Sequence, residues 1–432
     1  MYSHTPQCIS AALLFSALAL APITVANERP VTIACGAVGD ELEQCEASVR
    51  NWEQLTGHSV TIVPLPDESN LRLDFYQSIM SAGSPELDVF QLDVVWAGLL
   101  GHDLIDLRPY LTAEDPEFFG GLITNNTTAN GELIALPWFI DTGLLYYRRD
   151  LLDKYNQPLP ETWEDLERIA SHIMAQEQRG LSGNKLWGYV WQGDSYEGLT
   201  CDALEWFYSY TGSSFVEVDM SVSILQPGNI EILQRAAGWI GTISPPETIA
   251  HKEEDARAVF QAGDAVFMRN WPYAWGTAQR PDSAIRGLIG MAPLPRGPNG
   301  VSAATLGGWQ LGVSQHSQNR ALAIELVRYL VSEQEQKRRA LAAGYNPSIP
   351  ALYNDPQLMA EYPQFADLVE IFQGGVPRPA TITGRGYPLV SRAIQRQVHR
   401  TLTGEQDAET ALRNLNAQLS RLSHWYGQQP VN

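Results

Sequence analysis

Residues 31–63, VTIACGAVGDELEQCEASVRNWEQLTGHSVTIV, decide the fold class of this chain. The stretch opens with the β-branched, apolar residues 31–35, which are typical of a buried strand. A turn with two glycines follows, and apolar residues then recur at helical spacing until Gly57 ends the pattern. Residues 58–63 form a second strand-like run. This strand–helix–strand order predicts an α/β fold, in which helices flank a sheet.

The same alternation continues along the chain. Further strands are expected at residues 87–95, 133–137 and 143–147, with extended segments at 287–294 and 303–313. Helices are expected at residues 69–82, 164–178, 196–211, 230–243, 251–262, 319–341 and 408–426. Residues 138–142 have the character of a passage between two bodies. The pattern therefore predicts two α/β lobes joined by more than one crossover.

Length and charge restrict the function classes. The 432 residues are enough for two or three domains. The chain has 29 Lys plus Arg and 49 Asp plus Glu, which gives a net charge of −20. Such an acidic protein is poorly suited to holding phosphate backbones or anionic membranes. Nucleic-acid binding is thereby excluded, and the 12 Trp and 17 Tyr raise the question of what they stack on.

The N-terminal residues have the pattern of an export signal. Residues 9–25 are mostly apolar, and small residues precede a cleavage point after Ala26. The alternative is an uncleaved membrane anchor, but the apolar run is short for a span of about 20 residues and Pro22 breaks it. We therefore predict a cleaved signal peptide, residues 1–26, and an exported, periplasmic protein.

Export favours disulfide formation among the cysteines that remain after cleavage. Cys35 ends the first expected strand, and Cys45 lies one turn into the following helix, so the two can face each other across the turn. We predict a Cys35–Cys45 disulfide and a free Cys201. The alternative is that Cys35 and Cys45 are two small buried hydrophobic residues.

The usual catalytic motifs are absent from the sequence. It contains no HExxH, GxSxG, Walker, GxGxxG or CxxC motif, and its eight histidines are scattered singly. The remaining enzyme class is a glycoside hydrolase, which needs only two carboxylates beside a sugar. Asp93, Asp141 and Glu41 are the candidates, and their local sequence neither supports nor excludes this role.

Aromatic residues stand where the chain is expected to change direction. Trp271 and Trp275 interrupt a polar turn, and Gly307-Gly308-Trp309 opens an extended segment. Sugar faces pack on flat aromatic rings, whereas sugar hydroxyls pair with carboxylates and arginines. Glycines let a ligand approach the backbone. The pattern indicates a sugar site, although core packing is the alternative for each tryptophan taken alone.

Six motifs, in one order, carry a family resemblance. They are DVFQLDVVW at 88–96, IDTGLLYYR at 140–148, WGYVWQG with YEGL at 187–199, RNWPYAW at 269–275, AATLGGW at 303–309 and VPRP at 376–379. The chain resembles the extracellular solute-binding proteins of carbohydrate ABC importers, especially the trehalose/maltose-binding branch of the maltose-binding-protein-like family. The resemblance implies a type II two-lobe fold that closes on a disaccharide and delivers it to a membrane permease, with no cofactor or metal.

The resemblance also implies the ligand-binding residues. Position by position, they are Asp40 or Glu41, Arg72, Asp93, Phe139, Asp141, Trp271, Gly307, Gly308, Trp309 and Arg378. Trp271 and Trp309 would be stacking platforms, the two aspartates 93 and 141 hydroxyl acceptors, and the two arginines donors. Phe139 replaces a tyrosine of the relatives and so lacks one hydroxyl, which would alter the preferred disaccharide.

The expected lobes are discontinuous in sequence. Lobe I is expected to comprise residues 27–137 and 301–345, and lobe II residues 138–300 and 346–432. Hinge crossovers are expected near 137–142, 295–308 and 345. The resemblance implies a monomer that meets the importer's permease subunits. A sensor that presents itself to a chemoreceptor would use the same site, and a secreted glycosidase is the rival from another class.

Overall fold

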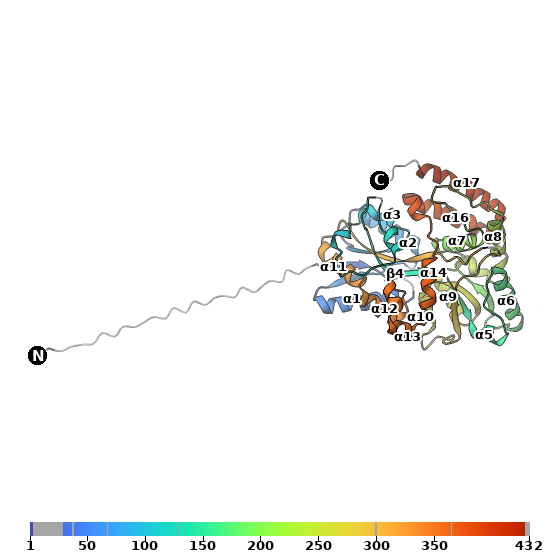
Figure 1. Cartoon of the computed structure of the whole chain (residues 1–432), viewed down its shortest axis with the longest axis horizontal. Coiled ribbons are helices and arrows are strands. Elements are labelled where there is room, and N and C mark those ends of the chain that lie inside the picture. The colour runs from blue at the N-terminus through green and yellow to red at the C-terminus, as the bar shows by residue number, and fades with distance from the viewer. Residues whose placement is uncertain are drawn as a thin grey trace.

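The computed structural model describes residues 1–2, 29–36, 39–66, 68–128, 130–298, 300–363 and 365–427. Residues 3–26 of the expected export signal lie outside this part of the chain. In the described part, two bodies lie side by side, with α1, α2 and α11 in one and α5, α6 and α8 in the other (Figure 1). Each body contains its own sheet. The predicted two-body α/β architecture is confirmed.

The first sheet has five strands in the order β2-β1-β3-β9-β4. Its strands are Val31–Ala34 (β1), Val60–Val63 (β2), Val89–Asp93 (β3), Leu136–Thr142 (β4) and Leu306–Val313 (β9). β1 pairs in parallel with β2 and β3, whereas β9 runs antiparallel between β3 and β4. The late strand β9 therefore lies between β3 and β4, inside a sheet built otherwise from the first third of the chain.

The second sheet has four strands in the order β6-β7-β5-β8. Its strands are Leu144–Arg148 (β5), Trp187–Val190 (β6), Ala265–Asn270 (β7) and Ile289–Ala292 (β8). β5 pairs antiparallel with both β7 and β8, and β6 pairs in parallel with β7. This sheet places the end of β7, next to Trp271, beside the beginning of β5.

Helices cover both sheets. The first body contains Glu41–Thr56 (α1), Ser69–Ser81 (α2), Ala97–Leu100 (α3), Gly120–Asn125 (α4), Arg320–Leu330 (α11), Glu333–Ala343 (α12), Pro356–Glu361 (α13) and Phe365–Gln373 (α14). The second contains Arg149–Lys154 (α5), Trp163–Gln176 (α6), Glu197–Thr211 (α7), Pro227–Trp239 (α8), Glu253–Gln261 (α9), Tyr387–Leu402 (α16) and Ala408–Gly427 (α17). Tyr273–Ala278 (α10) contacts α12, and Ala380–Thr383 (α15) contacts α3 and α16. Short 3₁₀ helices are Gly101–Asp103, Arg108–Tyr110, Pro246–Ala250, Pro350–Asn354 and Gly384–Gly386.

The chain passes from the first sheet to the second through a single glycine. β4 ends at Thr142 and β5 begins at Leu144. A Cβ on Gly143 would lie 2.1 Å from Oε1 of Glu205 and 2.8 Å from Nη2 of Arg269. Only glycine fits this passage, because any side chain would displace a buried ion pair. The expected passage at 138–142 is itself part of β4, so the change of sheet comes one residue later.

The chain returns to the first sheet between β8 and β9 and leaves it again after α14. Val376 pairs with Thr305, so the segment that leaves the first sheet lies beside the segment that returns to it before β9. Ile349, Leu352 and Leu358 share a hydrophobic core with the first sheet, whereas residues 390–419 pack in the core of the second. We propose that the last segment of lobe II begins near residue 376, later than the expected residue 346.

The structure has two helices, α11 and α12, where the sequence predicted one. The prediction of a continuous helix over 319–341 is wrong, because α11 ends at Leu330 and α12 begins at Glu333. The Ser332 side chain caps α12 by accepting a hydrogen bond from the Glu335 backbone N–H. A serine side chain that accepts from this N–H stabilises the start of a new helix, because the N–H would otherwise have no partner in the first turn.

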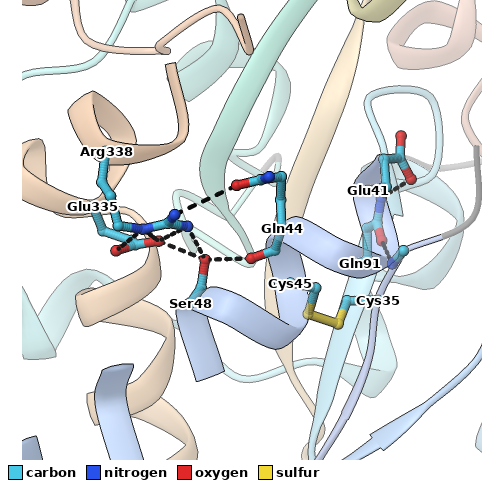
Figure 2. The surroundings of a disulfide bond; sticks show 9 residues. Cys35, Glu41, Gln44, Cys45, Ser48, Gln91, Glu335 and Arg338 are labelled. Atoms are coloured by element: carbon cyan, nitrogen blue, oxygen red, sulfur yellow. Dashed lines mark hydrogen bonds and ion pairs between the residues drawn. A yellow bond between two sulfur atoms is a disulfide. The ribbon is translucent and has the colours of Figure 1, made fainter. Parts of the chain in front are cut away.

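The predicted disulfide between Cys35 and Cys45 is confirmed, with a Cα–Cα distance of 6.4 Å. Figure 2 shows that it joins the end of β1 to α1, close to the buried Ser48. Among the described residues, Cys201 is the cysteine outside a disulfide, and it is buried. In the same part of the chain, no helix combines the length and apolar character needed to cross a membrane.

Candidate ligand-binding site

A pocket lies where the two bodies meet. It encloses about 620 Å³ of space free of protein atoms, part of it open to solvent. We call it the central pocket. It is lined by Glu41, Ser69, Arg72, Asp93, Asp141, Tyr196, Glu197, Gly198, Cys201, Glu253, Trp271, Tyr273, Gly307, Gly308, Trp309 and Arg378.

Strand pairing brings distant sequence motifs together at this pocket. β9 pairs Trp309 with Asp93 of β3, and it pairs Gly307 with Asp141 of β4. Gly308 has φ of +115°, and a Cβ there would lie 2.4 Å from the carbonyl oxygen of Phe139. The glycine is needed because a side chain at this position would collide with the neighbouring strand.

Both predicted stacking platforms line the pocket, and each carries an arginine on one face. The Arg72 guanidinium carbon lies 4.3 Å from the Trp309 ring centroid, and that of Arg269 lies 4.0 Å from the Trp271 ring centroid. Trp96 packs edge-on against Trp309, with ring centroids 5.7 Å apart. Cation–π contacts of this kind stabilise the orientation of each ring. The indoles are therefore held in place by the protein.

The acidic residues of the pocket have different environments. Asp93 accepts hydrogen bonds from Arg378 at 2.9 Å, the Val95 backbone at 3.2 Å and Ser69 at 3.3 Å. Burial raises the pKa of Asp141 to about 8. The carboxylates of Glu41 and Asp93 add to this shift, and the guanidinium of Arg339 opposes it. Asp93 therefore has its negative charge compensated, whereas Asp141 favours its neutral form.

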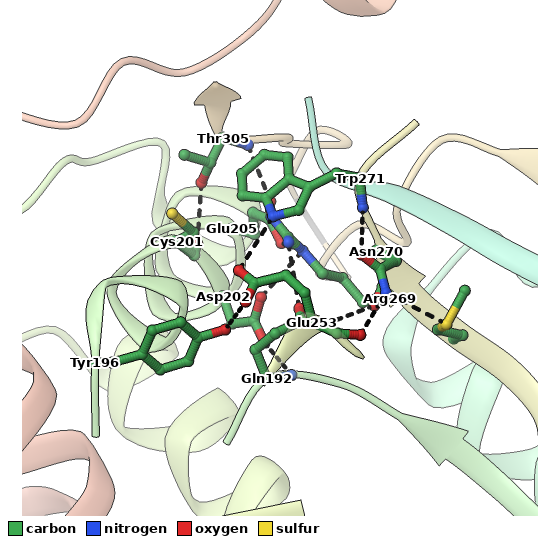
Figure 3. Close-up of polar contacts among 11 residues, drawn as sticks. Gln192, Tyr196, Cys201, Asp202, Glu205, Glu253, Arg269, Asn270, Trp271 and Thr305 are labelled. Carbon is green, nitrogen blue, oxygen red and sulfur yellow. Dashed lines mark hydrogen bonds and ion pairs between the residues drawn. The ribbon is translucent and has the colours of Figure 1, made fainter. Parts of the chain in front are cut away.

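A second polar network contacts one face and the N–H edge of the Trp271 ring (Figure 3). Arg269 donates to both carboxylate oxygens of Glu205, at 2.6 and 3.0 Å, and pairs with Asp202 at 3.0 Å. Glu253 accepts from the Trp271 indole N–H at 3.4 Å and from the Tyr196 hydroxyl at 2.6 Å. These bonds fix the edge and one face of the Trp271 ring.

The structure brings most of the predicted site residues together, with two exceptions. Glu41, Arg72, Asp93, Asp141, Trp271, Gly307, Gly308, Trp309 and Arg378 all line the central pocket. Asp40 does not line it, because its carboxylate pairs with Arg280 outside the pocket. Phe139 does not line it either. Its ring is buried against Tyr345 and Trp138, with centroids 5.1 and 5.5 Å away.

Several lining residues were missed by the sequence reasoning. They are Ser69, Tyr196, Glu197, Gly198, Cys201, Glu253 and Tyr273. The YEGL motif at 196–199 was already part of the family resemblance, and Tyr273 lies inside the tryptophan-rich turn. Tyr196, Glu197, Gly198 and Tyr273 could therefore have been predicted from these two motifs. Nothing in the sequence singles out Glu253, because an acidic residue at the start of a helix is ordinarily solvated and interacts with the helix dipole.

The described residues offer no cluster for a metal ion. Within those ranges, no group of three or more His, Cys, Asp or Glu side chains is arranged to hold one. The donors and acceptors at the pocket are instead those that recognise hydroxyl groups: carboxylates, guanidinium groups, tyrosine hydroxyls and aromatic faces.

The fold and pocket are those of a sugar-binding protein of the type II periplasmic class, in which two α/β lobes enclose a ligand. Residues 39–337 match the family of bacterial extracellular solute-binding proteins, and the chain belongs to this family. It is 44% identical over 414 residues to a probable ABC transporter-binding protein of Deinococcus radiodurans, covering 95% of this chain and 98% of that protein.

Solved structures agree with this assignment. The maltose-bound MalE3 protein of T. maritima is 38% identical to this chain, with a TM-score of 0.85 over 91% of this chain and 99% of that one. A solute-binding protein of Thermotoga lettingae, bound with α-D-tagatose, has a TM-score of 0.81 at 22% identity, covering 91% of this chain and 100% of that one. The latter shows the shared fold. This chain is therefore a sugar ABC transporter solute-binding protein.

Proposed function

We propose that the chain captures a disaccharide in the periplasm, either trehalose, maltose or a related α-glucoside, and delivers it to the permease of an ABC importer. The observation that carries the proposal is the convergence of two arginine-backed indoles, Trp271 and Trp309, with ionised side chains in one pocket. The rings suit the apolar faces of a sugar, and Asp93 with Arg378 suits its hydroxyl rim.

The arrangement supports capture by closure. Asp93 and Trp309 belong to the first sheet, whereas Trp271 follows β7 of the second. Each body alone offers half of the contacts, so a sugar that touches both stabilises the closed arrangement. The maltose bound to the similar T. maritima protein supports an α-linked disaccharide as the ligand. We propose further that the exported protein acts as a monomer.

One observation favours the glycosidase alternative. Asp93 is ion-paired with Arg378, whereas burial raises the pKa of Asp141 to about 8. A carboxylate and a neutral carboxylic acid in one pocket are the two groups that sugar hydrolysis uses. The family assignment favours binding without reaction, and the two functions differ in the fate of the sugar.

The experiment that separates them uses residues 27–432 as a purified protein. With trehalose or maltose added, tryptophan fluorescence is expected to change saturably while chromatography recovers the sugar intact. Release of glucose at an enzymatic rate would replace the carrier with a hydrolase. Calorimetry with trehalose, maltose, maltotriose and ribitol then identifies the ligand class. Tight binding of ribitol alone would overturn the disaccharide assignment.

A further inference from the structure

Arg378 contacts groups from both bodies at the central pocket. Its Nη2 donates to Oδ1 of Asp93 at 2.9 Å, and its Nη1 donates to Oε1 of Glu197 at 2.8 Å. Asp93 ends β3 of the first sheet, whereas Glu197 begins α7, which packs with α8 and α16 in the second body. A guanidinium group is a rigid planar fork, so a partner that holds one nitrogen sets the direction of the other.

Glu197 is itself held by a third element. Tyr387 and Ser391 of α16 donate to its two carboxylate oxygens, the Ser391 contact at 2.6 Å. Ser391 in turn shares a hydrogen bond of 2.7 Å with Thr200, one turn further along α7. Glu197 is only 7% exposed. These bonds lie within the second body, so they do not depend on a contact with the first body or with a ligand.

We infer that Glu197 is a positioning residue for sugar binding, which orients the Arg378 guanidinium toward Asp93 and the central pocket. The inference rests on the proposed sugar-binding function and adds a residue to it. Without Glu197, Arg378 keeps only its contact with Asp93 of the first body, so its long side chain becomes fully ordered only when the two bodies close on the sugar, and that ordering weakens affinity. Glu197 thus acts through Arg378 and not through its own contact with the sugar.

A double-mutant cycle distinguishes these two roles. Calorimetry with maltose, the sugar bound by the similar T. maritima protein, is expected to show about tenfold weaker affinity for Glu197→Gln than for the wild type. In an Arg378→Met background, measured at millimolar sugar, Glu197→Gln is expected to cause no further loss. Equal losses in both backgrounds would show direct sugar contact and overturn the positioning role. The double variant Tyr387→Phe/Ser391→Ala, which leaves Glu197 intact, is expected to weaken affinity in the same Arg378-dependent way.

A matched control addresses simple destabilisation. Glu335 of α12 is a buried carboxylate that also accepts bonds from a serine, a tyrosine and an arginine, namely Ser48, Tyr329 and Arg338. Glu335→Gln is expected to lower the melting temperature as much as Glu197→Gln while sugar affinity stays at the wild-type value. Loss of affinity in this control would indicate general destabilisation and overturn the inference.

The sugar-free protein gives an independent readout. The Arg378 Nε–Hε signal in nuclear magnetic resonance, assigned by its loss in Arg378→Lys, is expected to be sharp in the wild type and averaged by motion in Glu197→Gln. An equally sharp signal in both would overturn the inference. If the wild type binds no sugar but Glu197→Gln still shows this loss of order, only the proposed function would be contradicted.

Discussion

The Arg72 guanidinium carbon lies 4.3 Å from the centroid of the Trp309 ring. An arginine stacked in this way holds the ring while its in-plane N–H groups remain directed outward, and Nε of Arg72 donates to the Pro66 carbonyl oxygen at 2.8 Å. Arg269 and Trp271 repeat the relationship at 4.0 Å. The pocket therefore has two aromatic surfaces whose orientation the protein stabilises before ligand enters, which reduces the entropy lost on binding.

Replacing Trp309 with alanine is expected to weaken sugar binding about tenfold or more, because the variant loses the aromatic surface against which the sugar packs. Trp187→Ala is the matched control. Trp187 is also half-buried and also carries a cation, with Lys185 Nζ 3.5 Å from its ring centroid, but it lies outside the pocket. Calorimetry and thermal unfolding of both variants check this. Similar losses of stability with no difference in affinity would contradict a ligand role for Trp309.

The two adjacent glycines of β9 are expected to respond differently to alanine. A Cβ at Gly307 would lie 2.9 Å from the Trp271 ring, so Gly307→Ala should mainly weaken sugar affinity. A Cβ at Gly308 would lie 2.4 Å from a backbone oxygen of β4, and φ is +115°, so Gly308→Ala should mainly lower stability, by about 1–3 kcal/mol.

Gly238 provides the control for these glycines, because a Cβ there meets no atom within 4 Å. Alanine at this position in α8 is expected to leave affinity unchanged and to stabilise the helix slightly. The measurements are urea unfolding and calorimetry. An affinity loss for Gly308→Ala that exceeds that for Gly307→Ala would contradict the assignment.

The stability of the sugar-free protein is expected to depend on the ionisation of Asp141. Its pKa in the folded protein is about 8, mainly because the carboxyl group is buried and also because the carboxylates of Glu41 and Asp93 are near. An aspartate in an unfolded chain has a pKa of about 3.9. Between these values the folded protein holds a proton that the unfolded chain releases. The contribution of Asp141 to the free energy of unfolding therefore falls as pH rises from about 4 to about 8, and then levels off.

Asp141→Asn removes this dependence, so its melting temperature relative to the wild type is expected to increase from pH 5 to pH 9. Asp219→Asn is the control, since hydrogen bonds from Ser221 lower the pKa of that exposed carboxylate. Thermal unfolding of the three proteins across this range tests the point. A constant difference between Asp141→Asn and wild type would show that Asp141 is ionised throughout.

An ion pair beside the pocket is expected to support closure. Lys252 Nζ, at the start of α9, lies 3.1 Å from Glu68 of the first body and 3.7 Å from Asp194 of the second. Lys252→Met should weaken sugar affinity about two- to fivefold at low salt, since exposed pairs contribute up to about 1 kcal/mol. High salt should remove the difference. Arg413→Gln, which breaks a pair within α17, should change nothing. Equal affinities for Lys252→Met and wild type at low salt would contradict this role.

Cys201 is expected to report the occupancy of the pocket. It lines the pocket and is buried, so an alkylating reagent reaches it only when the two bodies separate. Saturating sugar should slow its alkylation, measured by mass spectrometry, by about the factor by which the sugar lowers the open population. Cys35 and Cys45 should stay unmodified in both cases because they are paired. Faster alkylation with sugar would contradict a closing pocket.

Local sequence was sufficient for much of the fold. Gly57 and Gly212 end α1 and α7 in the left-handed conformation, and both helix ends were predicted from these glycines or the pattern before them. The break at Ser332 between α11 and α12 was not predicted, because the residues that follow it, EQEQKRRALAA at 333–343, are all good helix formers and give no local stop signal. The true extent of β4 was also missed, since residues 138–142 are buried by pairing with β9, which comes more than 160 residues later.

The sequence by itself determined the alternation of strands and helices, the cysteines close enough to pair, and the residue types that suit a sugar. Those properties depend on residues that are close together in the sequence. Only the tertiary structure decided which candidates meet. It placed Asp93, Asp141 and Trp309 on adjacent strands, left Phe139 in the core, and turned Asp40 toward Arg280. Strand register and packing between distant segments set these outcomes, and neither is encoded in the spacing of nearby residues.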